Sequence, residues 1–263
     1  LGLADGCNLI STGIWFRFRI KISQEIYMEE VSILIPVYKR HEFLALTLQN
    51  IKMQDYPHGK LTVVIDECLS NEPFIRDGEL GSVIKYLHPI NVIHNVYPHR
   101  ATIGEKRNRL VKMSHTKYCQ FFDSDDLYKP SCISYNHGLL KEKRVKCVGS
   151  DKMLFCYLLD GFKMSGINCG GKINLIHEAT MFFDRKWFAS TAKFERNSMG
   201  EGRRLFEGLT SKLVHISDIH RIMICLVHNT NTVSKEIFKK GELPRMNEDA
   251  VVWLKGILQM REA

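Results

Sequence analysis

The stretch FFDSDDLY at residues 121–128 decides the fold of this chain, because it joins a buried strand to a cluster of carboxylates. The run KYCQFF at residues 117–122 is typical of a strand that enters a core. The residues after such a strand emerge at the carboxyl edge of its sheet, where open α/β sheets bind ligands. Side chains two residues apart on an extended segment point the same way, so Asp123 and Asp125 can share one ligand. Oxygen ligands of this kind suit Mg²⁺ or Mn²⁺, so the pattern predicts a metal site.

The same acidic stretch has an ordinary structural interpretation. Asp and Ser are common turn and cap residues, so residues 123–126 could instead cap a helix that begins near Pro130. The stretch alone does not separate these two hypotheses, and the rest of the chain has to decide between them.

The composition is that of a globular protein with an anionic partner. With 263 residues, 44% of them hydrophobic and 25% charged, the chain is long enough for one large α/β domain or two small ones. Its net charge of +8 at pH 7 favours a nucleotide, a nucleic acid or a membrane surface as partner. The basic residues are scattered and no nucleic-acid-binding motif accompanies them. We therefore expect no nucleic acid partner, while peripheral contact with a membrane stays open.

The cysteines and the amino-terminal sequence indicate the cellular compartment in which the protein is expected. Eight cysteines lie far apart and form no CxxC pair, which favours buried free thiols in a reducing compartment. No run of about 18 apolar residues occurs, so no membrane span is predicted. We therefore expect a soluble cytoplasmic protein, in the host cytoplasm if the chain is viral. Residues 1–27 lack the pattern of a secretory signal, and MEEVSILIPVYKR from Met28 looks like a natural start. Residues 1–27 are therefore expected to be an appendage outside the fold.

Strands and helices alternate from Val31 onward. Strands are predicted at residues 31–37, 61–66, 91–96 and 117–122, and helices at residues 41–54 and 103–114. This order implies a largely parallel, doubly wound sheet with right-handed crossovers. The carboxyl edge of this sheet, where a ligand would bind, is expected to carry Pro36, Val37 and Tyr38, Asp66 with Glu67, and the acidic stretch.

After Ser150 the elements become shorter and mixed. We expect apolar strands at residues 152–159, 179–184, 213–217 and 221–227, a glycine-rich turn at 166–171, a helix at 199–212, and a last helix capped by Asn247. This half is rich in strands and loops, which suits it to shape a second pocket. There are no internal repeats and no low-complexity linker, so residues 28–263 are expected to form a single domain.

Four motifs occur in one order along the chain: VSILIPVYKR at 31–40, VVIDE at 63–67, GEKRN at 104–108 and FFDSDD at 121–126. In this order they resemble the inverting glycosyltransferases of family 2, which have the GT-A fold. The resemblance runs over about residues 31–234 and is to compact members from bacteria or large viruses. It implies metal-dependent transfer of a hexosyl or pentosyl group, with inversion, from a nucleotide-diphosphate donor, preferably a UDP-sugar. The acceptor would be a hydroxyl of a glycan or another glycoconjugate. About residues 31–150 would bind the donor, and about residues 151–263 would face the acceptor.

The resemblance also assigns roles to single residues. It assigns the nucleotide sugar to Pro36, Val37, Tyr38, Asp66, Arg107, Asp123 and Ser124, and the metal, Mn²⁺ or Mg²⁺, to Asp125 of the DXD pattern. His228, in CLVHNTNTVSK, is a further candidate ligand. The role of Asp66 is chemically sensible because the uracil ring presents an N–H donor that a carboxylate accepts. Tyr38 could instead be an ordinary aromatic residue at a strand end, and Asp66 could be a turn residue. Lys106 is interpreted as a solvated charge on a helix.

Inversion requires a base that deprotonates the acceptor hydroxyl. The family has Glu followed by Asp ahead of a helix, whereas residues 199–202 of this chain are Met-Gly-Glu-Gly, with glycine in place of the second acid. We expect Glu201 to be the base, with Asp184, Glu178 and Glu207 as rivals. A charge that favours a helix N-terminus is the structural alternative for Glu201.

Two other functions remain. A nucleotidyltransferase that makes sugar nucleotides would need a glycine-rich loop after the first strand, but VYKRHEFL at residues 37–44 has no glycine. A catalytically inactive relative that only binds a nucleotide sugar would account for Gly202.

Overall fold

The computed structural model describes residues 28–191, 193–198, 200–207, 209–231, 234–240 and 243–260. The predicted appendage, residues 1–27, lies outside the described residues, and so does Met199 of the predicted acidic motif.

The first half of the chain alternates strands with helices. Its elements are β1 (Val31–Val37), α2 (Leu44–Lys52), β2 (Leu61–Cys68), α3 (Leu80–Leu87), β3 (Asn91–Tyr97), α4 (Ile103–Met113), β4 (Tyr118–Phe121), β5 (Leu127–Tyr128) and α5 (Cys132–Lys143). The second half contains β6 (Cys147–Gly149), β7 (Lys152–Tyr157), β8 (Lys163–Asn168), β9 (Phe182–Asp184), α6 (Arg185–Thr191), β10 (Val214–Ile216), β11 (Met223–Val227) and α7 (Glu248–Ile257). A 3-10 turn, η4 (Glu178–Thr180), precedes β9.

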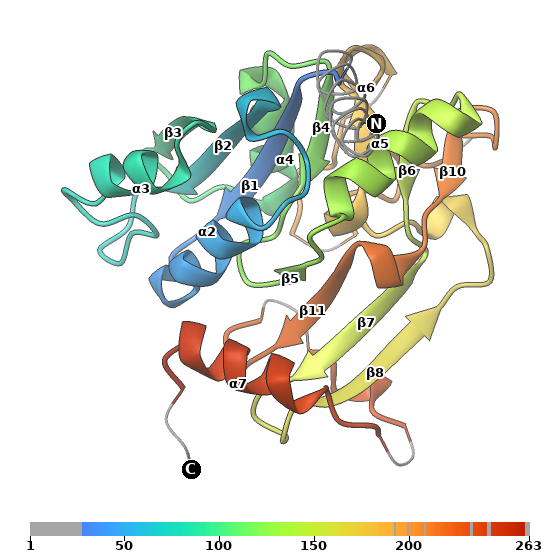
Figure 1. The fold of residues 1–263 in the computed structure, drawn as a ribbon. Helices are drawn as coiled ribbons and strands as arrows, with labels where there is room; N and C mark the ends of the chain where they lie inside the picture. The colour runs from blue at the N-terminus through green and yellow to red at the C-terminus, as the bar shows by residue number, and fades with distance from the viewer. Residues whose placement is uncertain are drawn as a thin grey trace, which may run out of the picture.

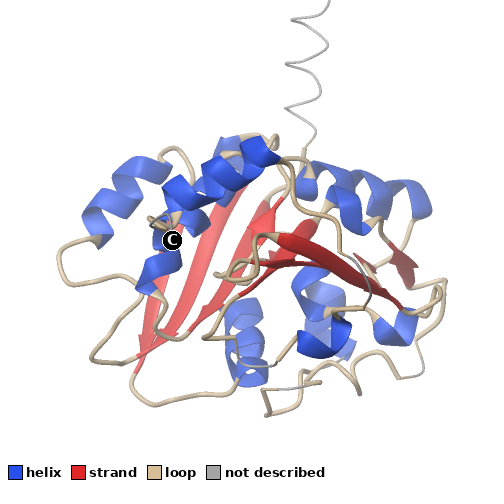
Figure 2. Ribbon diagram, turned by 90° about the horizontal axis from the view of Figure 1, so that it is seen from below, coloured by secondary structure: helices blue, strands red, loops and turns tan. Residues whose placement is uncertain are grey.

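The larger sheet has the strand order β10-β6-β9-β4-β1-β2-β3 (Figure 1). β1 pairs in parallel with β2 and β4, and β2 pairs in parallel with β3. β9 runs antiparallel to both of its neighbours, β4 and β6. Helices cover both faces of this sheet (Figure 2). The predicted α/β class, with a mostly parallel, doubly wound sheet, is confirmed.

β1 is buried along its whole length and separates two cores. Ile33 and Ile35 pack in one cluster with apolar side chains of α2, α3 and α5. Leu34 packs in a second cluster with Leu110 and Val111 of α4. Successive side chains of a strand point to opposite faces, so a strand covered on both faces is mostly apolar. This explains the run VSILIPV, in which the one polar side chain, Ser32, accepts hydrogen bonds from the Ser114 and Thr116 hydroxyls.

A second, four-stranded sheet has the strand order β5-β11-β7-β8. Its strand β11 runs parallel to β7 and antiparallel to the short β5, which directly follows the acidic loop. α7 packs on this sheet through Val251 and Leu254, which share a cluster with Leu226 of β11. Asn247 caps α7 by accepting hydrogen bonds from the backbone N–H groups of Asp249 and Ala250, as predicted.

The structure differs from the sequence-based expectation in several places, and the strand predicted at residues 179–184 begins only at Phe182, after the 3-10 turn η4. The helix α3 was not predicted. The glycine-rich turn begins later than residue 166, because Gly166 lies within β8 opposite Leu154 of β7. Residues 200–207 form turns instead of part of the predicted helix at 199–212. Gly200 has a φ of 64°, which no helix continues through, and Glu201 turns inward to a buried position.

Two predictions concern the thiols and the membrane. The cysteines in the described part of the chain are free, and all of them except Cys169 are buried, as predicted. None of the helices in the described ranges is long and apolar enough to cross a membrane.

Candidate active site

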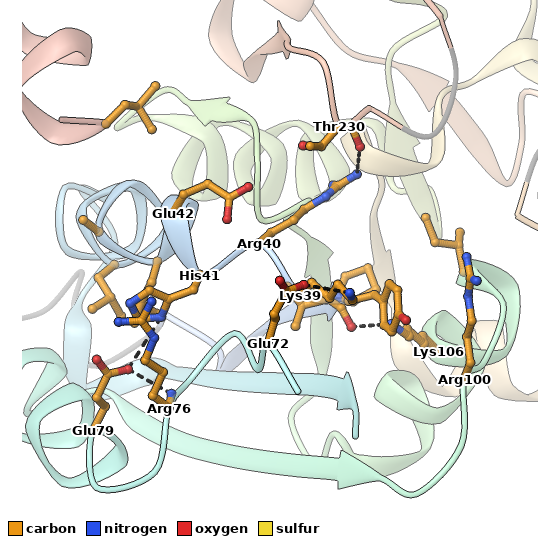
Figure 3. A pocket seen from close by; sticks show the side chains of 18 of the residues that line it. Lys39, Arg40, His41, Glu42, Glu72, Arg76, Glu79, Arg100, Lys106 and Thr230 are labelled. Carbon is orange, nitrogen blue, oxygen red and sulfur yellow. Dashed lines mark hydrogen bonds and ion pairs between the residues drawn. The ribbon is translucent and has the colours of Figure 1, made fainter. Parts of the chain in front are cut away.

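Two adjoining cavities open at the carboxyl ends of β1 and β4. The larger, which we call the large cleft, has a volume of about 1210 Å³ and is lined by residues that follow β1 and by basic side chains near α4 (Figure 3). The smaller, which we call the acidic cavity, has a volume of about 290 Å³ and is lined by Arg107, Asp123, Asp125, Asp126, Glu178 and Glu201, among others. Pro36, Arg40, Ile103 and Ser198 line both, so the two cavities share a wall.

Positive charge surrounds Tyr38 in the large cleft. Lys39 Nζ, Arg100 Cζ and Lys106 Nζ lie 5.8, 5.0 and 5.3 Å from the centre of its ring. Lys106 is only 2% exposed and donates a hydrogen bond to the Val37 carbonyl, so the interpretation as a solvated helix charge is wrong. Its burial lowers its pKa. An aromatic ring beside several cations suits a ligand with a flat base and phosphate groups.

Arg40 reaches the acidic loop because the backbone turns sharply after β1. Lys39 and Arg40 have φ angles of 60° and 69°, a region that residues other than glycine seldom adopt. Arg40 Nη1 donates a hydrogen bond to Asp125 Oδ2, and Nη2 donates to the Thr230 carbonyl over 3.2 Å. Arg40 therefore ties the end of β1 to the acidic loop and to the segment after β11.

Asp125 meets His228, although 103 residues separate them in the sequence. His228 Nε2 lies 3.0 Å from Asp125 Oδ2, and both side chains are buried. Burial opposes ionisation of Asp125, but the hydrogen bond with His228 and the charge of Arg40 outweigh it and hold the pKa of Asp125 below its usual value. The fold thus brings together the two residues that were predicted as metal ligands.

The donor set at this point fits a divalent cation that a ligand helps to hold. Asp125 and His228 supply one carboxylate and one imidazole, and no group of three or more His, Cys, Asp or Glu side chains suited to a metal occurs among the described residues. Mg²⁺ binds through one or two protein groups when phosphates and water complete its coordination. Because Arg40 contacts the same Asp125 oxygen, a cation and the guanidinium would share or compete for it.

The other residues of the acidic loop have separate partners. Asp123 accepts a hydrogen bond from Arg107 Nη2 over 3.0 Å. Asp126 Oδ1 accepts one from the backbone N–H of Leu226 over 3.0 Å, which fixes the loop to β11. Burial, followed by the charges of Asp125 and Asp123, raises the pKa of Asp126 well above its usual value. Ser124 is buried and is not among the described residues that line either cavity, so its assignment to the nucleotide sugar stays a prediction.

The helix-cap hypothesis for this loop is wrong. α5 begins only at Cys132, its N-cap residue is Ser131, and no side chain caps it. The carboxylates of the loop instead contact Arg40, Arg107 and β11. These carboxylates lie just after the carboxyl end of β4, as the metal-site hypothesis requires.

Arg107 is the centre of the acidic cavity. Its Nη1 lies 2.8 Å from Glu201 Oε1 and 4.0 Å from Glu178 Oε2, while Nη2 contacts Asp123. Burial would lower the pKa of Arg107, but the charges of Asp123, Glu201 and Glu178 together raise it. For Glu201, burial outweighs the charge of Arg107 and raises the pKa. Arg107 therefore forms ion pairs that organise the acidic cavity, and its assignment to the nucleotide sugar stays a prediction.

Asp66 is not among the described residues that line either cavity, although it pairs with Pro36, which lines both. It is fully buried, and it accepts hydrogen bonds from Arg109 Nη2 over 2.7 Å and from Asn95 Nδ2 over 2.6 Å. Its assignment to the uracil edge stays a prediction. Glu67 beside it contacts His94 and the backbone of Phe74.

Asp184 is excluded as the base by the direction of β9. Because β9 is antiparallel to β4, Asp184 lies opposite Tyr118 at the start of β4, whereas the acidic loop follows the end of that strand. There Asp184 pairs with Lys146 and accepts a hydrogen bond from the backbone of Trp187. Its rival Glu207 is exposed to solvent. Glu178 and Glu201 are the glutamates that line the acidic cavity among the described residues.

Several basic residues that line the large cleft were not predicted as site residues, among them Lys39, Arg40, Arg76 and Arg100. Arg40 ends the motif VSILIPVYKR, so its place next to Tyr38 was a usable signal. Arg100 lies in the connection between β3 and α4, where its residue type alone gives no indication of a site.

Gly104 holds α4 against the segment that carries Glu201. Its N–H donates to the Asn197 carbonyl, and a Cβ at this position would lie 1.8 Å from the Glu195 carbonyl oxygen. We expect Gly104→Ala to lower the free energy of unfolding by about 1 to 3 kcal/mol, because the segment must be displaced. Chemical denaturation measures this. Gly138→Ala in α5 is the control, since its Cβ would meet nothing within 4 Å. It should be neutral or stabilise by up to about 1 kcal/mol, and equal effects of both changes would contradict the prediction.

Comparison with known proteins gives the class of this chain. The profile of "Glycosyl transferase family 2" matches residues 32–151. The poly(ribitol-phosphate) beta-N-acetylglucosaminyltransferase TarS of Staphylococcus aureus (strain Mu50) is 25% identical over 146 residues, which are 55% of this chain and 22% of TarS. The putative teichuronic acid biosynthesis glycosyltransferase TuaG of Bacillus subtilis (strain 168) is 26% identical over 114 residues, 43% of this chain and 42% of TuaG. The chain thus spans less than half the length of these relatives.

Solved structures share the fold. The S. aureus TarS fragment 1–349 in complex with UDP-GlcNAc superposes with a TM-score of 0.57 at 15% identity, over 80% of this chain and 63% of that one. The mannosyltransferase PcManGT from Pyrobaculum calidifontis, in complex with GDP-Man and Mn²⁺, superposes with a TM-score of 0.58 at 16% identity, over 87% and 67%. The chain therefore has the GT-A fold. Its residues 32–151 are similar to glycosyl transferase family 2.

Proposed function

We propose that this protein transfers a sugar from a nucleotide-diphosphate donor, preferably a UDP-sugar, to a hydroxyl of a glycan or related acceptor, with inversion at the sugar. The observation that carries this proposal is the pair of adjoining cavities. One is a cationic cleft beside an aromatic ring, the other is lined by carboxylates, and Arg40 stands in the wall between them. A nucleoside diphosphate fits the first, and the reacting sugar fits the second.

In this proposal the donor lies along the ends of β1 and α4. Pro36, Val37 and Tyr38 line the cleft that would receive the nucleoside. Arg40 and Arg100 would face the diphosphate, because both line the same cleft. The S. aureus fragment in complex with UDP-GlcNAc and PcManGT in complex with GDP-Man support a nucleotide-sugar donor but differ in the base. The preference for UDP therefore rests on the sequence resemblance.

A divalent cation would be held by Asp125 and His228 together with the diphosphate. When bound, it would act as a Lewis acid that stabilises the negative charge growing on the leaving group. Support comes from the 3.0 Å contact between the two side chains and from the Mn²⁺ in the complex of PcManGT. Arg40 adds positive charge at the same point, and Asp126 holds the loop in place through its bond to β11.

The acceptor would approach from the second half of the chain. The glycosidic carbon becomes oxocarbenium-like as the leaving group departs, and a base must take the proton of the attacking hydroxyl. The relatives TarS and TuaG are named for poly(ribitol phosphate) and teichuronic acid. We therefore propose a glycan or a similar polyhydroxylated polymer as the acceptor. Residues 28–263 would act as a single transferase domain.

A panel of nucleotide sugars tests this function and its alternatives. We expect one donor, a UDP-sugar, to release its nucleoside diphosphate faster than the others, with the rate lowered by a chelator and restored by Mn²⁺. Isothermal titration of the free nucleotide measures binding separately. Tight nucleotide binding without turnover of any donor would point to the inactive relative. Release of pyrophosphate from a nucleoside triphosphate and a sugar phosphate would point to a nucleotidyltransferase.

A further inference from the structure

Gly202 leaves open the space that the Glu178 carboxylate occupies. A Cβ built on it would lie 2.4 Å from Glu178 Oε1, 2.9 Å from its Cγ and 3.0 Å from its Cδ. Real side chains do not approach so closely, so the absence of a Cβ at residue 202 makes the space in which the Glu178 carboxylate lies. The Gly202 N–H also donates a hydrogen bond to Glu178 Oε1 over 3.0 Å. The glycine thus both admits the carboxylate and orients it.

Resting on the proposed function, we infer that Glu178 is the general base of the transfer and that Gly202 is the positioning residue that admits it. Glu178 begins η4 and lies 24 residues before Gly202 in the sequence. Its carboxylate stands in the acidic cavity where a side chain at position 202 would otherwise project. The acid missing beside Glu201 is supplied by a different element of the fold.

The chemistry of the step balances with this one carboxylate. The acceptor oxygen forms a bond to the anomeric carbon while the bond from that carbon to the diphosphate oxygen breaks. The bonding electron pair leaves with the nucleoside diphosphate, and the proton of the acceptor hydroxyl passes to Glu178. The base must lie across the sugar from the leaving group, so it must come from outside the acidic loop.

Glu201 is less suited to this role than Glu178. The Glu201 side chain is 7% exposed and binds the guanidinium of Arg107 at 2.8 Å. The Glu178 side chain is 22% exposed, and its Oε2 lies 4.0 Å from Arg107. No residue in the described ranges donates a hydrogen bond to this Oε2, which leaves it open to a hydroxyl. We therefore assign Glu201 the positioning of Arg107 and, through it, of Asp123.

His177 is the other candidate base in the same cavity. Its Nε2 is enclosed and has no hydrogen-bond partner among the described residues. Burial lowers the pKa of His177, so the neutral ring adds no charge beside Glu178. His177→Asn is therefore a useful comparison, because it removes the imidazole and leaves Glu178 in place.

The first test is Glu178→Gln, which keeps the size of the side chain and an oxygen for the Gly202 N–H. We expect kcat to fall by about 100-fold or more, within the range of general-base catalysis, while donor KM and UDP affinity stay unchanged. His177→Asn should lose much less. A Glu178→Gln protein that keeps its kcat to within about threefold would overturn the inference, and so would a loss confined to His177→Asn. If the wild-type chain turns over no nucleotide sugar, the proposed function fails instead.

The second test moves the carboxylate from residue 178 to residue 202. Gly202→Asp alone should be inactive, because two carboxylates would then share one space. In Glu178→Ala that space is empty, so adding Gly202→Asp should restore kcat by about 10-fold or more over Glu178→Ala alone. Melting temperatures of all variants monitor folding. Failure of this rescue in folded protein, together with a raised donor KM in Glu178→Gln, would assign Glu178 a structural role and overturn the inference.

Discussion

Replacing Arg107 with methionine is expected to lower the free energy of unfolding by about 3 to 5 kcal/mol and to abolish turnover. Arg107 is 3% exposed and lies between Asp123 and Glu201, with Glu178 close by. Removing the guanidinium leaves these carboxylates facing one another without a compensating charge. Urea denaturation of wild type and variant measures the loss, and donor turnover is measured on the folded variant.

An exposed ion pair is the control for this large effect. Lys143 contacts Glu142 at 2.7 Å, but their side chains are 40% and 67% exposed. Such surface pairs contribute roughly 0 to 1 kcal/mol, so Lys143→Met should change stability little. If Arg107→Met proves no more destabilising than Lys143→Met, then the ion pair does not organise the acidic cavity.

Asp125→Ala is expected to lower donor turnover by about 100- to 1000-fold, comparable to the loss of one preorganised electrostatic group. The Asp125 carboxylate is the point at which Arg40 and His228 meet, beside the proposed diphosphate. Without it, neither positive group nor a cation is held in place where charge develops. Steady-state kinetics over a range of Mn²⁺ concentrations measure the effect.

An exposed carboxylate that lines the large cleft, Glu72, provides the matched control. Its side chain is 67% exposed and contacts Lys39. Glu72→Ala should keep turnover within about threefold of wild type, because a solvated pair contributes little. An Asp125→Ala protein with full Mn²⁺-dependent activity would contradict the assignment of Asp125.

The sheet and the acidic loop were predictable because they depend on local patterns. A seven-residue run rich in Val and Ile, such as VSILIPV, is typical of a strand covered on both faces, and alternation with helices then orders the neighbouring strands. The carboxyl ends of β1 and β4 meet at one edge in any such sheet, which places Pro36, Val37 and Tyr38 near Asp123 and Asp125.

The remaining site depends on contacts that no local pattern records. The strand around residues 182–184 was predictable, but its antiparallel direction was not, and this direction places Asp184 at the far edge of the sheet. Lys106 has the residue type of a solvated helix position, yet the Val37 carbonyl and Tyr38 bury it. The meeting of Glu178 with Gly202 spans 24 residues and depends on a missing Cβ. Gly202 is visible in the sequence, but its contact with the Glu178 carboxylate is not predictable from it.

The central claim is that a sugar passes from a nucleotide diphosphate to an acceptor hydroxyl in a single inverting step. Proton NMR of a reaction containing the preferred donor and a hydroxyl acceptor measures this directly, since it shows the anomeric configuration of the first product formed. We expect stoichiometric release of the nucleoside diphosphate and a glycoside with the anomeric configuration opposite to that of the donor. A product with retained configuration, or sugar transfer without release of the nucleoside diphosphate, would contradict this claim.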